Sequence, residues 1–422
     1  MKKTALIVAG LLTTISSMEA SQDAGKILEV SGVQGGLVVV IGCDSPELLE
    51  GLRAGDSYVV HGLDRDPGKV ASARVYLREK GLYGSVTASQ WDGSQLPFAD
   101  DLVNLLVESG ESNSTTDEIV RVLAPNGVAV RQSPDTRHLT PDAFFRKPWP
   151  AEIDQWSHFL HDASNNAVSS DTVVEPPKGL RWTCGPAYAR SHEHFSSMSA
   201  MVTAGGRIFY IIDEGPISSV YLPPQWKLVA RDAFSGVLLW DRPITNWEAH
   251  LRGFRSGPPE IGRRLVATDD RIYGAFDYGE SVAVLDAATG KELATVPNTD
   301  GARELLLTDG TLFVLADDMT AAQHNERREA INQGFLRTSP DLSIWQRLQR
   351  KAYPMYGTQR SVAIRTGEGS YARQRVDSAT SVPPCGDGSS KLLWSREFDK
   401  AGEFVPPPMA VDDGKGCGGG VS

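Results

Sequence analysis

The first third of the chain alternates short, uninterrupted apolar runs with amphipathic segments. Residues 36–43 read as a buried strand, and residues 45–52 read as a helix with a proline in its first turn. A second strand over residues 57–63 ends at Asp64 and precedes a helix over residues 67–81. The pattern continues with strands over residues 85–88, 101–107 and 127–130 and a helix over residues 117–123. This β-α-β-α order predicts a Rossmann-like domain over about residues 24–148, with its ligand crevice at the carboxyl ends of the strands.

A different pattern follows a proline-bounded linker at residues 144–150. Two stretches, residues 228–240 and 282–294, each predict a strand, a tight turn and a returning strand. In each turn an aspartate can accept bonds from backbone N–H groups and a glycine can supply a positive φ; these residues are Asp232 with Gly236 and Asp286 with Gly290. Further strand pairs are predicted at residues 201–212, 264–274 and 305–315. Four antiparallel strands per repeat predict β-propeller blades over residues 149–316.

The repeat pattern weakens after residue 316. Residues 317–358 predict two amphipathic helical pieces inserted in a blade, and residues 359–422 predict a partial blade with a disordered tail from residue 414 onward. About three blades can be counted, whereas a closed propeller needs at least four. The fold class expected is therefore α/β plus all-β, with an incomplete propeller in a chain that looks truncated or carries an altered reading frame near its end.

Composition limits the classes of function. The 422 residues include 41 Gly and 25 Pro, and 42 basic against 53 acidic side chains give a net charge of −11, which disfavours binding to nucleic acid. The four cysteines, Cys43, Cys184, Cys385 and Cys417, lie far apart without zinc-site spacing, so they predict neither a zinc site nor a disulfide framework and leave one long-range disulfide open.

The first twenty residues have the three parts of a secretory signal. Lys2 and Lys3 precede an apolar stretch at residues 5–12, which is much shorter than the roughly 20 residues of a membrane span. We expect cleavage after Ala20 and an exported, periplasmic or extracellular protein without a transmembrane anchor. A cytosolic N-terminal strand or helix is the alternative, because Glu19 makes the cleavage site imperfect.

Several short matches in the first domain resemble class I S-adenosylmethionine-dependent methyltransferases. Residues 39–43 look like the family's first strand and glycine loop, and residues 121–127 are similar to its R-V-L-x-P-G-G turn. The resemblance implies a cofactor site in which Gly42 allows close approach of the backbone, Asp64 binds the ribose hydroxyls and Asp92 binds the adenine side. Solvated carboxylates at strand ends are an equally good interpretation of both aspartates.

The glycine loop departs from the family pattern at three positions. Val40 replaces an acidic residue, and Asp44 and Pro46 replace glycines. Pro46 has a fixed φ and no N–H group to offer a ligand. We therefore expect a degenerate pocket, and an exported domain would also lack the methyl donor, which is a cytosolic metabolite.

The repeat of the form A-x-D-x-x-T-G-x-x-x-W resembles the pyrroloquinoline quinone-type propeller of quinoprotein dehydrogenases. Trp240 matches the tryptophan that docks between blades, whereas Ala294 departs from it. The resemblance implies a quinone and a calcium ion in the central funnel of catalytic members, but no residue matches their base or calcium ligands. The combination with the first domain is similar to bacterial exported multidomain proteins that carry such repeats.

Two pairs of histidines stand out. His158 and His161 would share a helix face, and His192 and His194 would share one face of a strand or turn. Metal binding is one hypothesis; hydrogen-bonded packing, with Asp162 and other local acceptors, is the favoured one.

The leading functional hypothesis is an exported two-domain protein with a degenerate methyltransferase-like domain, no catalytic residues and no required cofactor. Its quinoprotein-like propeller would act as a binding or assembly module for an unknown protein or envelope component. The alternatives are an S-adenosylmethionine-dependent methyltransferase and a quinone-dependent dehydrogenase.

Overall fold

The computed structural model divides the chain into two compact units. One comprises Met1–Glu152, Val173–Cys184 and Arg231–Trp240, and the other comprises Ile153–Thr172, Gly185–Ala230 and Asp241–Ser422. The structure describes residues 22–109, 114–131, 144–174, 176, 179–190, 197–218, 222–245, 247, 259–277, 279–317, 322–323, 326, 359–365, 391–398, 409–412 and 415–418.

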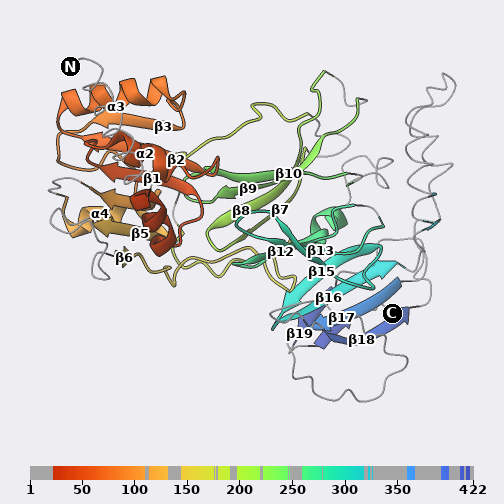
Figure 1. Cartoon of the computed structure of the whole chain (residues 1–422). Coiled ribbons are helices and arrows are strands. Elements are labelled where there is room, and N and C mark those ends of the chain that lie inside the picture. Colours follow the sequence, from red (N-terminus) through yellow and green to blue (C-terminus); the bar gives the residue numbers. More distant parts are fainter. Residues whose placement is uncertain are drawn as a thin grey trace. The chain divides into compact units, whose positions relative to one another are not determined.

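The first unit is built on a six-stranded mixed sheet with the order β3-β2-β1-β4-β5-β6 (Figure 1). Its strands are β1 (Gly36–Ile41), β2 (Tyr58–Asp64), β3 (Val86–Gln90), β4 (Val103–Glu108), β5 (Leu123–Arg131) and β6 (Phe144–Arg146). The first five are parallel, and β6 runs antiparallel to β5. The predicted Rossmann-like sheet is confirmed. The linker prediction is wrong at its start, because residues 144–146 form the edge strand.

Local chemistry explains where the helices of this unit begin. They comprise residues 22–31, α2 (Pro46–Leu52), α3 (Pro67–Glu79) and α4 (Thr116–Val122). Prolines occupy the first turn of α2 and α3, and the Asp66 carboxylate caps α3 by accepting a bond from the N–H of Gly68. The Thr115 hydroxyl caps α4 in the same way by accepting a bond from the N–H of Glu118.

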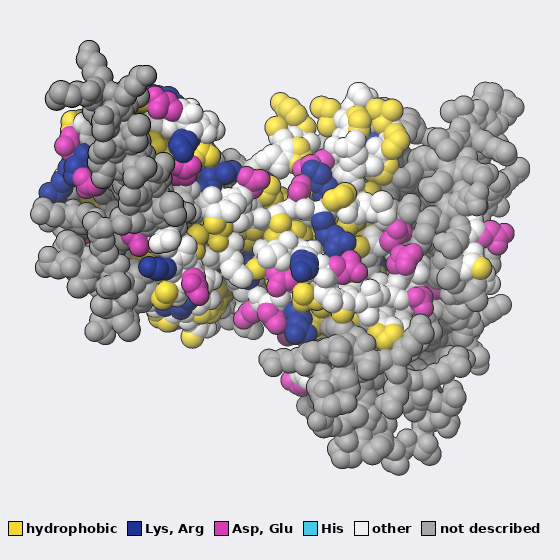
Figure 2. Space-filling view, viewed as in Figure 1, with side chains coloured by type: hydrophobic (Ala, Val, Ile, Leu, Met, Phe, Trp, Pro, Cys, Tyr) yellow, Lys and Arg dark blue, Asp and Glu magenta, His cyan; other side chains and the backbone are white. Residues whose placement is uncertain are grey.

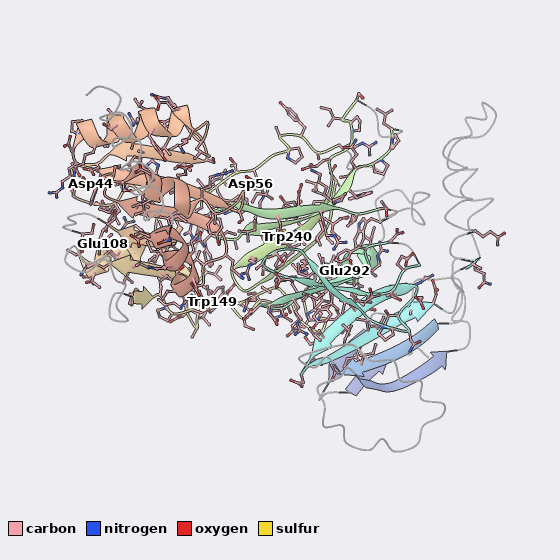
Figure 3. The ribbon with its side chains drawn as sticks, in the orientation of Figure 1. Asp44, Asp56, Glu108, Trp149, Trp240 and Glu292 are labelled. Atoms are coloured by element: carbon pink, nitrogen blue, oxygen red, sulfur yellow. The ribbon has the colours of Figure 1, made fainter. Side chains whose placement is uncertain are left out.

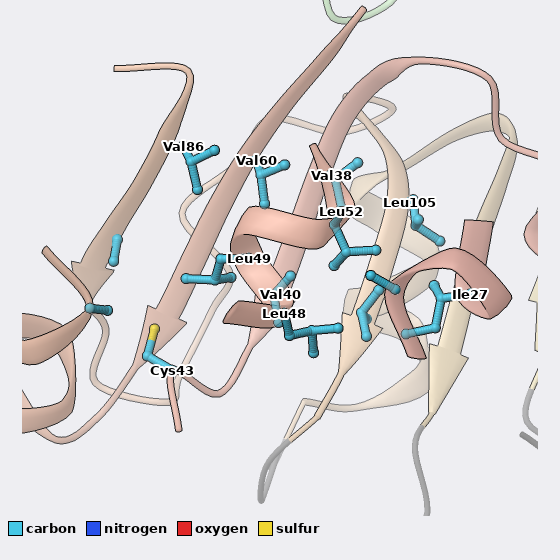
Figure 4. Close-up of a cluster of buried hydrophobic side chains, with 14 of the residues drawn as sticks. Ile27, Val38, Val40, Cys43, Leu48, Leu49, Leu52, Val60, Val86 and Leu105 are labelled. Atoms are coloured by element: carbon cyan, nitrogen blue, oxygen red, sulfur yellow. The ribbon is translucent and has the colours of Figure 1, made fainter. Parts of the chain in front are cut away.

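The helices cover both faces of the sheet. On one face, Ile27, Leu49 and Leu77 from the first three helices pack with strand residues such as Val38 and Val40 (Figure 4). On the other face, α4 contributes to a second cluster of Val39, Ile41, Leu106, Ile119 and Val122. Because strands buried on both faces need continuous apolar sequence, the runs found in the sequence correspond to this three-layer arrangement.

Beyond the mixed sheet, the described residues form three antiparallel four-stranded sheets and a two-stranded hairpin. The first sheet has the order β10-β9-β8-β7, with β7 (Met198–Ala204), β8 (Arg207–Asp213), β9 (Trp226–Asp232) and β10 (Leu238–Pro243). The second runs β11-β12-β13-β14, with β11 (Leu265–Ala267), β12 (Arg271–Gly274), β13 (Ala283–Asp286) and β14 (Glu292–Thr295). The third runs β15-β16-β17-β18, with β15 (Ala302–Thr308), β16 (Thr311–Asp317), β17 (Gln359–Arg365) and β18 (Lys391–Phe398). The predicted four-stranded repeat units are present as sheets.

The end of the chain differs from the expectation of a disordered tail. The strand β19 (Met409–Asp412) pairs with β20 (Lys415–Gly418) in an antiparallel hairpin. Disorder is therefore the wrong prediction for these four residues of β20. The predicted helical insertion lies almost wholly outside the described residues.

The repeated turns have the geometry that their sequence predicts. The Asp232 carboxylate accepts bonds from the N–H and hydroxyl of Ser235 at 2.6 and 2.7 Å, and Gly236 has a φ of 73°. The Asp286 carboxylate binds Thr289 in the same way at 2.8 and 2.7 Å, and Gly290 has a φ of 68°. Each turn is thus closed by one carboxylate and one left-handed glycine.

Trp240 does not have the expected core position. It is only half-buried, in the edge strand β10, where the neighbouring Leu238 is exposed. An edge strand lacks a second flanking strand, so its side chains keep contact with solvent. Burial of Trp240 between blades is therefore a wrong prediction.

The left-handed turn gives a test with an internal control. We expect Gly290→Ala to lower the free energy of unfolding by about 1–2 kcal/mol, because a Cβ is strained at positive φ. The same change at Gly25, an exposed helical glycine with open space where a Cβ would lie, should raise it by about 0.5–1 kcal/mol. Urea unfolding measures both variants, and equal effects of the two changes would contradict the turn assignment.

Candidate functional site

The candidate site lies at the carboxyl edge of the mixed sheet. Strand order reverses between β1 and β4, which is the place where open α/β sheets bind ligands. Gly42 follows β1, Asp64 ends β2, Asp92 follows β3 and Glu108 ends β4. Figure 3 labels Glu108 and, from the loop after β1, Asp44.

Gly42 makes the turn after β1. Its φ is 108°, a conformation that favours glycine, and its N–H donates to the carbonyl of Leu63 at 2.8 Å. The hydroxyl of Ser109 donates to the carbonyls of Ile41 and Gly42 at 3.2 and 3.4 Å. Both polar backbone groups of Gly42 therefore have partners within the protein.

The carboxylate of Asp64 is hydrogen-bonded to backbone groups of the loops around it. One carboxylate oxygen accepts from the N–H of Cys43 at 2.8 Å, and the other accepts from the N–H of Asp66 at 2.9 Å. The carboxylate thus ties the loop after β1 to the loop after β2. A ribose hydroxyl would have to share oxygens that already hold backbone donors.

Asp92 forms a local turn on the loop after β3. Its carboxylate accepts from the N–H and hydroxyl of Ser94 at 2.9 and 2.5 Å, and these hydrogen bonds lower the pKa of Asp92. The side chain is exposed. The N–H of Cys43, the residue after Gly42, thus links this loop to Asp64. Asp92 instead forms its hydrogen bonds within its own loop.

The substituted positions of the glycine loop also have local roles. Asp44 forms an ion pair with Lys69 of α3 at 2.6 Å, and this hydrogen bond raises the pKa of Lys69. Pro46 begins α2. Cys43 is buried, and burial followed by the charges of Asp64 and Asp44 raises the pKa of its thiol to about 12. Cys43 and Cys184 are both free thiols.

Glu108 is the residue that the sequence analysis missed. It is 4% exposed, and one carboxylate oxygen accepts from Nε of Arg131 at 2.7 Å. The other oxygen, Oε1, is buried without a hydrogen-bond partner among the described residues. The available signal was an acidic residue directly after the apolar run of β4, at the carboxyl end of a predicted parallel strand.

The histidine-bearing segment at residues 154–166 contacts one strand in each of the three four-stranded sheets. The carbonyl of Trp156 accepts from the N–H of Thr203 in β7, and the N–H of Trp156 donates to the hydroxyl of the same threonine. The carbonyl of Ser157 accepts from the N–H of Ala267 in β11, and Nε2 of His158 accepts from the N–H of Leu307 in β15 at 2.9 Å. Each of these strands stands at one end of its sheet.

The two histidines of this segment form hydrogen-bonded packing, not a shared helix face. They pair with each other as an isolated antiparallel bridge, and His161 has a φ of 72°. His161 bonds Asp154 through Nε2 at 2.6 Å, a closer partner than Asp162, whose oxygen lies 3.6 Å from Nδ1. His192 and His194 lie outside the described residues.

The protonation state of His158 follows from its contacts. Because Nε2 accepts a backbone N–H, the ring proton lies on Nδ1, 2.8 Å from the hydroxyl oxygen of Ser157. Burial lowers the pKa of His158 to about 4. Among the described residues, no three His, Cys, Asp or Glu side chains are grouped to hold a metal ion. No helix in the same part of the chain is long and apolar enough to cross a membrane.

Comparison with known proteins finds similarity only to solved structures. A putative S-adenosyl-L-methionine-dependent methyltransferase from Methanococcus maripaludis is 22% identical over 31% of this chain and 62% of its own, with a TM-score of 0.27. A putative sarcosine dimethylglycine methyltransferase from Galdieria sulphuraria is 17% identical over 27% and 46%, with a TM-score of 0.25. A geranyl diphosphate C-methyltransferase from Streptomyces coelicolor is 19% identical over 26% and 44%, with a TM-score of 0.24.

The matched part spans about half the length of these solved structures. Neither a protein-family model nor a curated protein matches the sequence. The similarity is distant and carries no conclusion about activity. The order and direction of the strands show that the N-terminal domain is Rossmann-like.

The hydrogen bonds of the Asp64 carboxylate predict how its removal changes stability. We expect Asp64→Ala to lower the free energy of unfolding by about 2 kcal/mol, since two backbone N–H groups lose a charged acceptor. Asp92→Ala should cost less than Asp64→Ala, because the Asp92 carboxylate closes only an exposed local turn. Chemical unfolding of both variants tests this, and a larger loss for Asp92→Ala would contradict it.

His158 makes a pH prediction. Its folded pKa of about 4 lies below the ordinary value of 6.5, so the unfolded state binds more protons between these limits and stability must fall as the pH drops through them. The loss should reach about 3 kcal/mol near pH 4. A His158→Gln variant keeps an acceptor for the N–H of Leu307 but does not titrate. Over the same pH range, its free energy of unfolding should therefore fall by about 3 kcal/mol less than that of the unchanged protein. Parallel curves for both proteins would refute the assignment.

Proposed function

We propose that this chain is a binding protein in which a methyltransferase-like domain has lost methyl transfer. The observation that carries the proposal is the Asp64 carboxylate, whose two oxygens hold the N–H groups of Cys43 and Asp66. The acid expected to bind the ribose thus stabilises the loops of an emptied cofactor pocket. A domain of this kind can keep its fold and lose its activity, because activity depends on the residues of the site.

The loop after β1 supports the same conclusion. The N–H of Gly42 is bound to Leu63 and that of Cys43 to Asp64, while Pro46 has none. Lys69 holds Asp44, the remaining acid of this loop. In the loop after β1, few N–H groups and no carboxylate without a partner therefore remain to bind the methionyl part of the cofactor.

The antiparallel sheets are proposed as the binding or assembly module, of quinoprotein-like propeller type. Support comes from the repeated Asp-x-x-Ser/Thr-Gly turns and from the segment at residues 154–166, which bonds to β7, β11 and β15. A module fixed at several sheets presents a constant surface to a partner, here an unknown protein or envelope component. Figure 2 shows basic and acidic side chains interspersed on the described part of one face, which suits a protein partner better than nucleic acid.

Export completes the proposal and depends on the first twenty residues, which lie outside the described part of the chain. Methyl transfer is the second candidate, favoured by the position of Asp64 at the end of β2 beside the strand-order reversal. No comparable observation favours a quinone-dependent dehydrogenase.

Calorimetric titration with S-adenosylmethionine tests the loss of methyl transfer. The full chain should release no binding heat at micromolar ligand, and an Asp44→Gly, Pro46→Gly variant serves as the control that restores the glycines of the loop. Binding by the unchanged protein that disappears in Asp64→Asn, which keeps the size of the side chain, would establish the methyltransferase alternative instead.

A further inference from the structure

Glu108 leaves one hydrogen-bonding position unused inside the first domain. Its Oε2 is held by Arg131 at 2.7 Å, while Oε1 is buried and has no partner among the described residues. A buried acceptor without a donor costs about 1–3 kcal/mol, and more when it carries charge. Such a group in a folded protein requires an explanation, either a bound water or a ligand.

The position of this carboxylate is that of a ligand site. Ile41 of β1 and Arg131 of β5 are the register partners of Glu108 on either side, so the three residues lie abreast at the carboxyl edge of the sheet. The strand order reverses between β1 and β4, next to Glu108. Open α/β sheets bind ligands at this point because the loops diverge there and leave a crevice.

The surroundings select the charge of a ligand. The N–H groups of Gly42 and Cys43 already have partners, so the adjoining loop offers few donors for a phosphate or carboxylate. The unpartnered atom at this edge, Oε1 of Glu108, is a carboxylate oxygen, which accepts hydrogen bonds and repels anions. A ligand that donates hydrogen bonds and carries positive charge suits this edge better than an anion.

We propose that Glu108 binds the ammonium group of a small organic amine, with Oε1 accepting a charge-assisted N–H···O bond. The inference builds on the proposed function, since it gives the crevice a ligand other than S-adenosylmethionine. Arg131 has a positioning role, because it holds Oε2 and thereby fixes the orientation of the carboxylate.

Putrescine, a four-carbon diamine, is the probe, and 1,4-butanediol is its neutral match. Calorimetry on the full chain at constant ionic strength should show putrescine binding and no butanediol binding. Glu108→Gln removes the charge while keeping the shape, and it should weaken putrescine binding tenfold or more. Glu118→Gln is the matched control, because Glu118 lies in the same domain with both oxygens bound by Arg121 and Leu96; its affinity for putrescine should equal that of the unchanged chain.

Absence of putrescine binding, or equal affinity in Glu108→Gln, would overturn the inference and leave a water on Oε1. Amide resonances of the unchanged protein provide a second readout if Glu108→Gln does not fold. Putrescine should shift the signals of Ile41, Ser109 and Arg131, and shifts confined to other regions would also overturn the inference. A parallel titration with S-adenosylmethionine separates the two proposals, since its binding contradicts only the proposed function, whereas failure of putrescine contradicts only this inference.

Discussion

In the second unit, one segment is hydrogen-bonded through backbone and side chains to a strand of each four-stranded sheet. Residues 154–166 bond to Thr203, Ala267 and Leu307, which belong to strands distant from one another in sequence. Separate antiparallel sheets pack together mainly through apolar contacts, which are not directional. Hydrogen bonds to a shared segment are directional, so they also fix how the sheets are oriented. The buried ion pair of Arg263 and Glu304, at 2.7 Å, adds a further polar contact within this unit. Polar contacts of this kind specify one arrangement, which apolar packing alone does less well.

In the first unit, the acids near the carboxyl edge of the mixed sheet have partners within the protein. Asp64 and Asp44 occupy the edge where the fold places ligands, yet one holds backbone N–H groups and the other holds Lys69. These contacts link the two acids to neighbouring parts of the same domain. Glu108 is the exception, because its carboxylate is only half satisfied.

The sequence predicted the features that are set by residues close together along the chain. Apolar runs located the five parallel strands of the mixed sheet but not its edge strand β6. The Asp232 and Asp286 turns were correct to the residue because their bonds span three positions. The sequence could not give the partner of His158, which lies 149 residues away, or the burial of Glu108, which depends on the neighbouring strands. Trp240 was misjudged for the same reason: a motif identifies the strand but not whether another element covers it.

The environment of Cys43 has a consequence for the chemical durability of the protein. Only the thiolate reacts with oxidants and electrophiles, and a thiol with a pKa of about 12 is ionised in about one molecule in 10⁵ at neutral pH. Cys43 is also only 2% exposed, so an oxidant has little access to its sulfur. An oxidising compartment would therefore act on the exposed thiol of Cys184 before the buried thiol of Cys43.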